Sequence, residues 1–228
     1  MDSITPIISI LPPTLAFLIF TAVLFFKFMK KKEKATMYFM FCFLCIGVGY
    51  GGWFIRSVFY LPGADAGTVF FWFKFAYMAT APFCTFLALA ALHFLNPQAM
   101  RKPRNLILFP APIIILEAWT FFSVPSLTLI AGQNDAVWPE SLSWGYAVIG
   151  GFYLAIANYV FLWFLIKNQG HHLYGKVLLI EIGLIFFAIG TIIESSKIGV
   201  EYIGQLWLFV RWFTALGALV MLYGYLKK

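Results

Sequence analysis

The sequence contains few charged residues. Asp, Glu, Lys and Arg make up 11% of its 228 residues, whereas a soluble domain carries about a quarter. Hydrophobic residues account for 62% of the chain. One compact soluble domain of this length could not bury so much apolar surface, so the composition predicts a membrane protein.

Cysteine and histidine are also scarce, with three of the former and three of the latter. The cysteines all lie in apolar segments, which argues against the disulfide framework of a small secreted domain. His93 stands alone, and the other two histidines are the adjacent pair His171 and His172. No converging set of three or four zinc ligands is therefore predicted. Signatures of serine hydrolases, P-loops and dinucleotide-binding sites are missing as well. We expect no catalytic residues, no metal site and no cofactor.

Long apolar runs dominate what is present. A membrane-spanning helix needs about 20 mainly apolar residues, and seven segments meet this requirement. Only the polar stretch 124–142 forms a longer connection, and none is long enough to separate a second domain. We therefore predict an all-α polytopic membrane protein, with one domain over 1–228 that forms a seven-transmembrane-helix bundle. The predicted spans are 7–29, 36–60, 68–95, 105–123, 143–167, 176–199 and 203–226.

Basic residues are concentrated on one side of these spans. Cytoplasmic loops of membrane proteins carry an excess of Lys and Arg. The distribution therefore places the N-terminus outside and the C-terminus in the cytoplasm, in the cell inner (cytoplasmic) membrane. The net charge of +7 then reflects orientation, and nucleic-acid binding is not indicated. The basic residues on the cytoplasmic side are Lys27, Lys30, Lys31, Lys32, Lys34, Arg101, Lys102, Arg104, Lys167, Lys176, Lys227 and Lys228.

Ionisable residues inside the spans are the least expected feature of the sequence. Burying one charge in hydrocarbon costs roughly 3 kcal/mol or more, so these side chains should face the interior of the bundle. Arg56, Lys74, Glu117, Glu194 and Arg211 lie at a similar depth in five different spans. We expect them to converge in the outer half of the bundle. Snorkelling of Arg56 and Lys74 to the outer interface is the alternative.

Lys74 lies among aromatic residues, in the stretch FWFKFAYMATAP. Its spacing from Tyr77 puts both on one helical stripe, which we predict lines a cavity that opens outward. Either Glu117 or Glu194 would then be the partner of Lys74. Three bases and two acids sum to +1, so an anionic or carbonyl-bearing amphiphile is the expected ligand. The predicted aromatic walls are Trp72, Tyr77, Trp207 and Trp212.

Two further expectations concern proline and a sixth ionisable residue. Pro82, Pro110 and Pro112 fall inside predicted spans, where proline kinks a helix. Glu181 lies near the inner end of the sixth span. We expect its side chain to snorkel or to pair with a lysine at the cytoplasmic face, and a proton site is the alternative.

The second and third spans carry a pattern over residues 47–96. A tryptophan late in the second span is followed by Phe71-Trp72-x-Lys74-x-x-Tyr77, by Pro82 and by Ala91-Leu92-His93-Phe94. This stretch resembles the N-terminal seven-helix region of bacterial and archaeal sensor histidine kinases, and the final LGALVMLYGYLKK resembles its exit into the cytoplasm. The resemblance implies a sensory module whose output is a cytoplasmic kinase. No kinase sequence follows here, so it implies a fragment or a free-standing relative, and it carries over no ligand-binding residue.

These observations leave three functional hypotheses open. The first is a non-enzymatic receptor-like module that binds a small amphiphile or lipid in its outer half and signals to a cytoplasmic or membrane partner. The second is a structural or accessory subunit of a larger membrane complex. The third is a small transporter or a membrane enzyme, for which a proton- or ion-coupled flux that depends on Glu117 or Glu194 would be the evidence. The expected partners are membrane lipids and another protein.

Overall fold

The computed structural model of the chain describes residues 4–60, 64–95, 98, 107–130, 133–195 and 206–227. Nearly all of these residues are helical. The elements in chain order are α1 (Ile4–Lys31), α2 (Lys34–Ile55), the π-helical turn η1 (Arg56–Tyr60), α3 (Ala66–Thr80), α4 (Pro82–Leu95), α6 (Ala111–Phe122), β1 (Ser126–Ile130), β2 (Gln133–Val137), α7 (Glu140–Lys167), α8 (Tyr174–Ser195) and α10 (Leu206–Leu226).

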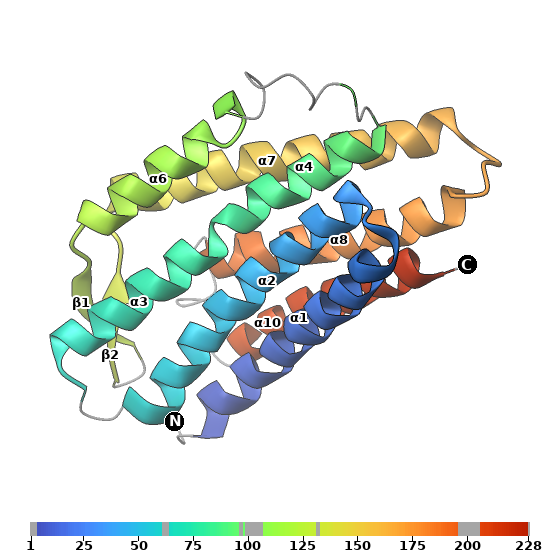
Figure 1. The fold of residues 1–228 in the computed structure, drawn as a ribbon. Helices are drawn as coiled ribbons and strands as arrows, with labels where there is room; N and C mark the ends of the chain where they lie inside the picture. Colours follow the sequence, from blue (N-terminus) through green and yellow to red (C-terminus); the bar gives the residue numbers. More distant parts are fainter. Residues whose placement is uncertain are drawn as a thin grey trace.

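The helices lie side by side in an elongated bundle (Figure 1). The hairpin β1–β2 and the beginning of α1 lie at one end, which we call the hairpin end. The turns from α1 to α2 and from α7 to α8 lie at the opposite end together with the C-terminus, and we call this the C-terminal end. Chain neighbours pack closely, and α10 packs against both α8 and α1. The first and last helices are therefore adjacent.

Five helices in the described ranges are long and apolar enough to cross a membrane: Ile8–Lys31, Lys34–Phe59, Ala66–Phe94, Glu140–Lys167 and Tyr174–Thr191. They correspond to the first, second, third, fifth and sixth predicted spans. The coarse prediction of a helical, multi-pass membrane protein is confirmed to this extent. The last predicted span coincides with α10, of which Val210–Leu226 is a shorter apolar helix.

The third span is interrupted where the sequence predicts a kink. Helix α3 ends at Thr80 and α4 begins at Pro82, with Ala81 between them in helical geometry. Proline has no amide hydrogen and cannot donate the helical bond to the carbonyl four residues earlier. The backbone direction is nevertheless kept, so residues 66–94 still form one apolar helical span.

The fourth predicted span differs from the structure. Helix α6 begins at Ala111 and has 12 residues, about 18 Å at 1.5 Å per residue, whereas a bilayer core is about 30 Å thick. Pro110 is its N-cap and Pro112 lies in its first turn. Proline is favoured there because the first amides have no helical partner. The expectation that Pro110 and Pro112 kink a helix from within was wrong, because they stand at the beginning of α6.

The polar stretch after α6 contains a β-hairpin that the sequence analysis did not predict. Strand β1 pairs with β2 in antiparallel register, from Ser126 opposite Val137 to Ile130 opposite Gln133. The hairpin is the exception to the predicted all-α class. It connects α6 to α7 and carries Trp138 directly after its second strand.

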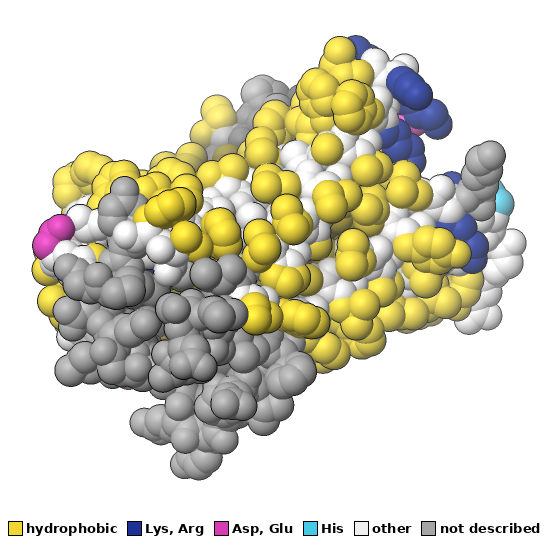
Figure 2. Space-filling view, turned by 90° about the horizontal axis from the view of Figure 1, so that it is seen from below, with side chains coloured by type: hydrophobic (Ala, Val, Ile, Leu, Met, Phe, Trp, Pro, Cys, Tyr) yellow, Lys and Arg dark blue, Asp and Glu magenta, His cyan; other side chains and the backbone are white. Residues whose placement is uncertain are grey.

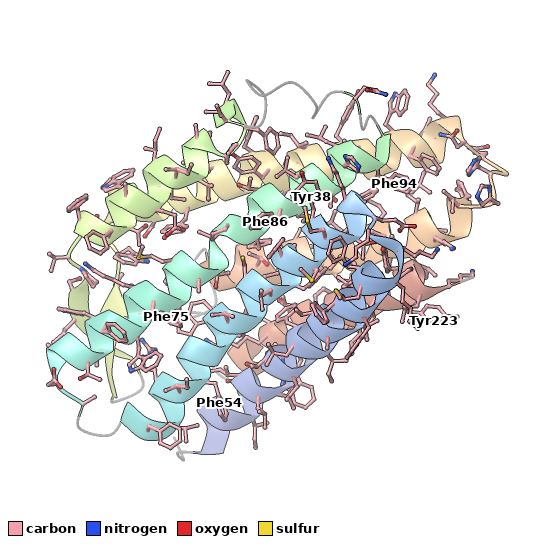
Figure 3. All side chains as sticks on the ribbon, viewed as in Figure 1. Tyr38, Phe54, Phe75, Phe86, Phe94 and Tyr223 are labelled. Carbon is pink, nitrogen blue, oxygen red and sulfur yellow. The ribbon has the colours of Figure 1, made fainter. Side chains whose placement is uncertain are left out.

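Aromatic side chains fill the centre of the bundle. Phe43 of α2 stacks on Phe20 of α1 with ring centroids 3.9 Å apart, and Phe187 of α8 meets both Phe17 of α1 and Phe83 of α4. Side chains also fill the space between α2 and α4 (Figure 3), where residues such as Tyr38 and Phe86 lie. Such packing supplies much of the stability of a helix bundle in lipid, where no hydrophobic driving force acts between helices.

The surface of the bundle is apolar along its length and charged at its ends. Lys and Arg side chains gather at the C-terminal end and acidic side chains lie at the opposite end, with hydrophobic side chains between them (Figure 2). A soluble protein rarely exposes so many large apolar side chains. A surface that faces lipid would do so. Examples are Phe26, Ile115, Phe122, Tyr159 and Ile166.

Helix α3 begins with an aspartate cap outside the membrane-spanning segment. Asp65 Oδ1 accepts a hydrogen bond from the Thr68 amide at 3.0 Å, and Asp65 Oδ2 accepts one from the Thr68 hydroxyl at 2.7 Å. The hydroxyl bond first, and the amide bond second, hold the pKa of Asp65 below its ordinary value. Both bonds favour the ionised carboxyl.

We predict a pH dependence at this cap. Folding lowers the pKa of Asp65, so the stabilisation that the cap gives to the folded state is fully present above the ordinary aspartate pKa of about 3.9. This stabilisation is lost as the pH falls through the lower pKa of the folded state. The Thr68 amide resonance, followed by NMR in micelles from neutral to acidic pH, should report this titration. In a Thr68→Val variant the Asp65 midpoint should move back toward the ordinary value. An unchanged midpoint would contradict the assignment.

Candidate functional site

Aromatic side chains from three helices and the hairpin connection meet around Tyr77 of α3. The centroid of its ring lies 5.6 Å from Trp53, 4.9 Å from Phe73, 5.5 Å from Trp138 and 5.2 Å from Tyr146. We call these five residues the Tyr77 cluster. The hydroxyls of Tyr77 and Tyr146 and the indole N–H groups of Trp53 and Trp138 add polar atoms to these rings, so the cluster is amphipathic.

Local structure explains how these residues come together. Phe73 and Tyr77 are four residues apart in α3 and share one helical face. The hairpin ends at Val137, and the next residue, Trp138, packs 4.8 Å from the Phe73 ring centroid. Helix α7 then begins at Glu140 and brings the Tyr146 ring centroid to 5.2 Å from that of Tyr77.

A polar group from α6 borders the cluster. The Thr120 hydroxyl shares a 2.6 Å hydrogen bond with the Tyr146 hydroxyl and lies 2.8 Å from the Leu116 carbonyl. Glu117 precedes Thr120 by three residues, on the neighbouring turn. Its carboxylate lies within electrostatic range of Tyr146 and of Cys45 on α2. Glu117 is thus the acidic group at the junction of α2, α6 and α7.

Two buried polar atoms at this site have no hydrogen-bond partner among the described residues. One is Glu117 Oε1 and the other is Trp138 Nε1. Leaving a buried donor or acceptor unsatisfied costs about 1–3 kcal/mol, and each such group in a folded protein calls for an explanation. One atom is an acceptor and the other a donor.

Lys74 forms no salt bridge with any acidic residue whose side chain the structure describes. Its Nζ donates a 3.0 Å hydrogen bond to the backbone carbonyl of Phe121 at the end of α6. The last carbonyls of a helix have no partner within the helix, and a lysine can bind them. Within the described ranges the salt bridges comprise only Lys31–Glu33. The expected Lys74–Glu117 ion pair is therefore wrong, and the side chain of Glu194 lies outside the described residues.

The structure also describes contacts made by Arg211 and Arg56 of the predicted cluster. Arg211 Nη1 donates to Ser9 Oγ at 3.1 Å, and Trp212 Nε1 donates to the Ile8 carbonyl at 3.1 Å. Both contacts fasten α10 to the first turns of α1. Arg56 is buried at the start of η1, where its backbone amide caps α2.

The predicted aromatic walls are only partly represented at the site. Tyr77 is its centre, whereas Trp72 contacts Phe71 and Phe75 of its own helix with ring centroids 5.3 and 5.6 Å away. Trp212 is 48% exposed, and the side chain of Trp207 is outside the described residues. Sequence reasoning missed Tyr146, Thr120 and the role of Trp138. For Trp138, the sequence feature that could have indicated its role was the position of a tryptophan within the polar connection 124–142.

Glu181 of α8 lies in a different environment from the predicted one. Its side chain is 2% exposed, and neither carboxyl oxygen has a hydrogen-bond partner within the described structure. The expectation that it snorkels or pairs with a lysine was wrong. The spacing from Val177 and Leu184, both buried, puts Glu181 on the buried stripe of α8.

An apolar groove lies on the surface between α4 and α7. Its volume is about 610 Å³, and it faces outward from the bundle rather than toward the Tyr77 cluster. Hydrocarbon chains of membrane lipids would suit such a surface. The lining residues are Leu92, Phe152, Ala155, Ile156, Tyr159, Val160 and Trp163.

Comparisons of the chain with protein-family models, with curated proteins and with solved structures found no match. The described part of the chain contains no group of three or more His, Cys, Asp or Glu residues that could hold a metal ion. The functional argument therefore depends on the geometry of the residues themselves.

Proposed function

We propose that the chain is a non-enzymatic, receptor-like sensory module of the cytoplasmic membrane that binds a small amphiphile at Glu117 and the Tyr77 cluster. One observation supports this most directly: a buried acceptor, Glu117 Oε1, and a buried donor, Trp138 Nε1, both lack partners beside the same aromatic cluster. A ligand whose polar end donates a hydrogen bond to Glu117 Oε1 would remove one of these two unfavourable terms on binding.

The residues favour a ligand whose polar end donates hydrogen bonds. The bases that favoured an anion are engaged elsewhere, Lys74 with the Phe121 carbonyl and Arg211 with Ser9. A carboxyl beside the faces of Tyr77 and Tyr146 suits an amine, which can pair with the acid and lie over the rings. The apolar tail of such an amphiphile would remain among aromatic side chains or lipid.

We propose that the bundle has seven spans with its N-terminus outside and its C-terminus in the cytoplasm. The concentration of Lys and Arg at the C-terminal end (Figure 2) supports this orientation by the positive-inside rule. The ligand site, near the hairpin, would then face outward. The resemblance that residues 47–96 bear to the sensory region of histidine kinases would imply a role in signalling, which we include in the proposal.

A contact at the C-terminal end supports signal output on the cytoplasmic side. Lys27 Nζ of α1 donates to the Tyr225 carbonyl at 3.2 Å and lies 3.8 Å from the centroid of that ring. The Tyr225 hydroxyl shares a short hydrogen bond with Thr36 of α2. Three helices thus meet where α10 ends, so a displacement of one would be transmitted to the others and to a partner there.

Thermal unfolding in detergent tests the proposal with three probes: dodecylamine, lauric acid and a short-tailed quinone. A ligand at about 100 times its Kd adds about 2.7 kcal/mol of stability, which corresponds to a Tm rise of roughly 5–10 °C for a chain of this length. We expect this rise with dodecylamine and not with lauric acid. Glu117→Gln should abolish it because the charge partner is lost.

The matched control is Glu140→Gln. Glu140 is an exposed glutamate at the start of α7, so the variant should respond to dodecylamine as the wild type does. If none of the three probes changes the Tm of the wild type, the proposed ligand site is wrong. If Glu140→Gln loses the response as well, the effect is not specific to the Tyr77 cluster.

A second candidate, an accessory subunit of a membrane complex, is favoured by the surface of α6. The helix is short, and its side chains Ile114, Ile115, Phe121 and Phe122 are all at least 60% exposed. Another membrane protein could cover this face. Purification from native membranes in mild detergent separates the two functions, because an accessory subunit would co-purify with companion chains and depletion of the subunit would disrupt their assembly.

A further inference from the structure

We propose that Glu181 is a proton-binding site enclosed within the bundle, which exchanges its proton with water. This site is distinct from Glu117 and the Tyr77 cluster and does not depend on the function proposed for them. Glu181 belongs to α8, on the stripe that also carries the buried Val177 and Leu184. Its carboxyl group is therefore enclosed by the bundle instead of facing lipid.

The neighbouring helices hold Glu181 in place. Helix α8 packs against α10 and α7, and the contact with α10 is close on both sides of Glu181. A Cβ on Gly183 would lie 2.5 Å from the Gly217 carbonyl, and one on Gly224 would lie 2.7 Å from Leu179 Cβ. Such close backbone approach leaves no room for the side chain to swing out between α8 and α10.

The charged and titratable groups around α8 do not reach the Glu181 carboxyl. Lys176 of α8 and Lys27 of α1 form no salt bridge within 4.0 Å in the described structure, and Lys27 is bound to Tyr225 of α10. Lys167 of α7 is exposed. Lys227, directly after α10, lies near Gly175, and the ring of His93 of α4 faces Tyr38. Arg211 of α10 and Glu140 of α7 lie toward the hairpin ends of their helices, on the far side from Glu181.

A proton is the ligand that this environment accepts. An ionised carboxylate without a partner in a low-dielectric interior carries a desolvation penalty of about several kcal/mol, which a bound proton removes. A divalent cation requires several converging ligands, and the described residues offer no cluster of three acidic, histidine or cysteine side chains. Ionisable residues inside membrane bundles commonly mark proton relays, so a single enclosed carboxyl suits reversible protonation.

Infrared difference spectroscopy of the full chain in lipid tests the proposal. The wild-type-minus-Glu181→Gln difference should contain the carbonyl stretch of a protonated carboxyl, which lies above the carboxylate band. The band should move on transfer to D₂O, because an exchanging proton is replaced by deuterium, and it should decrease as the pH is raised from 5 to 10. Glu117→Gln, as the matched control, should keep the Glu181 band.

Two results would overturn the proposal. A difference spectrum without a protonated-carboxyl band would show that Glu181 is ionised. A band that does not shift in D₂O, or that stays constant over the whole pH range, would show a carboxyl that does not exchange its proton. Should Glu181→Gln fail to fold, Glu181→Asp replaces it, because a retained carboxyl would move the band instead of removing it.

Discussion

Gly217→Ala should destabilise the protein by about 1–3 kcal/mol, the usual cost of inserting a methyl group into a packed interior. A Cβ at this position would lie 2.6 Å from the Gly183 carbonyl oxygen and 2.7 Å from the Phe187 amide nitrogen. Both atoms belong to the backbone of α8, so no side-chain rotation can relieve the clash. Helices α8 and α10 would have to separate, and SDS titration in mixed micelles would measure the lost free energy of unfolding.

Gly151→Ala is the matched control for this prediction. Gly151 lies within α7, and a Cβ there would meet no atom within 4 Å. Alanine is the better helix former by up to about 1 kcal/mol, so this variant should be as stable as the wild type or more stable. Equal loss of stability in the two variants would mean that the close contact between α8 and α10 is not what requires glycine at 217.

Glu181→Met should stabilise the protein by about 1–3 kcal/mol, the range of the penalty for a buried polar group without a partner. Methionine has a similar length and adapts its shape to the space around it. The carboxyl is 2% exposed and neither oxygen is hydrogen-bonded in the described structure, so the substitution breaks no described contact. The same SDS titration measures the gain, and a proton-binding function would be lost in exchange for it.

An exposed glutamate provides the comparison for Glu181→Met. Glu140→Met, at the surface of α7, should change the free energy of unfolding by no more than about 0.5 kcal/mol. A marked loss of stability in Glu181→Met would show that the carboxyl makes a favourable interaction in solution. That outcome would contradict the unpartnered environment from which the gain is predicted.

The helices were the most predictable part of the structure. Long apolar runs identified α1, α2, α7 and α8. The missing amide hydrogen of Pro82 explains why the helical hydrogen bonding is interrupted between α3 and α4. The start of α6 was not predicted correctly because Pro110 and Pro112 suit the first turn of a helix as well as a kink within one. The hairpin was missed because a polar connection between spans has no apolar periodicity strong enough to reveal two short strands.

The candidate site was less predictable than the helices. Tyr77 was selected from its place beside Lys74, but its neighbours Trp138 and Tyr146 come from 61 and 69 positions later in the chain. Ionisable residues at similar depth were expected to meet, and this stays a prediction. Among the contacts that the structure describes, Lys74 binds a carbonyl of α6 and Arg211 binds Ser9. Depth along a helix follows from residue number, whereas the direction of each side chain depends on the rotation of its helix about its axis.

Hydrophobic runs and charged loops establish that this is a helical membrane protein with charge concentrated at one end. These properties follow from composition and order along the chain, because hydrocarbon excludes charge and requires backbone hydrogen bonds to be made within each helix. Which polar side chains meet is a property of the packed helices. Glu181 and Glu117 are similar glutamates in apolar runs, and only the neighbours contributed by other helices enclose the first and place the second beside Tyr146.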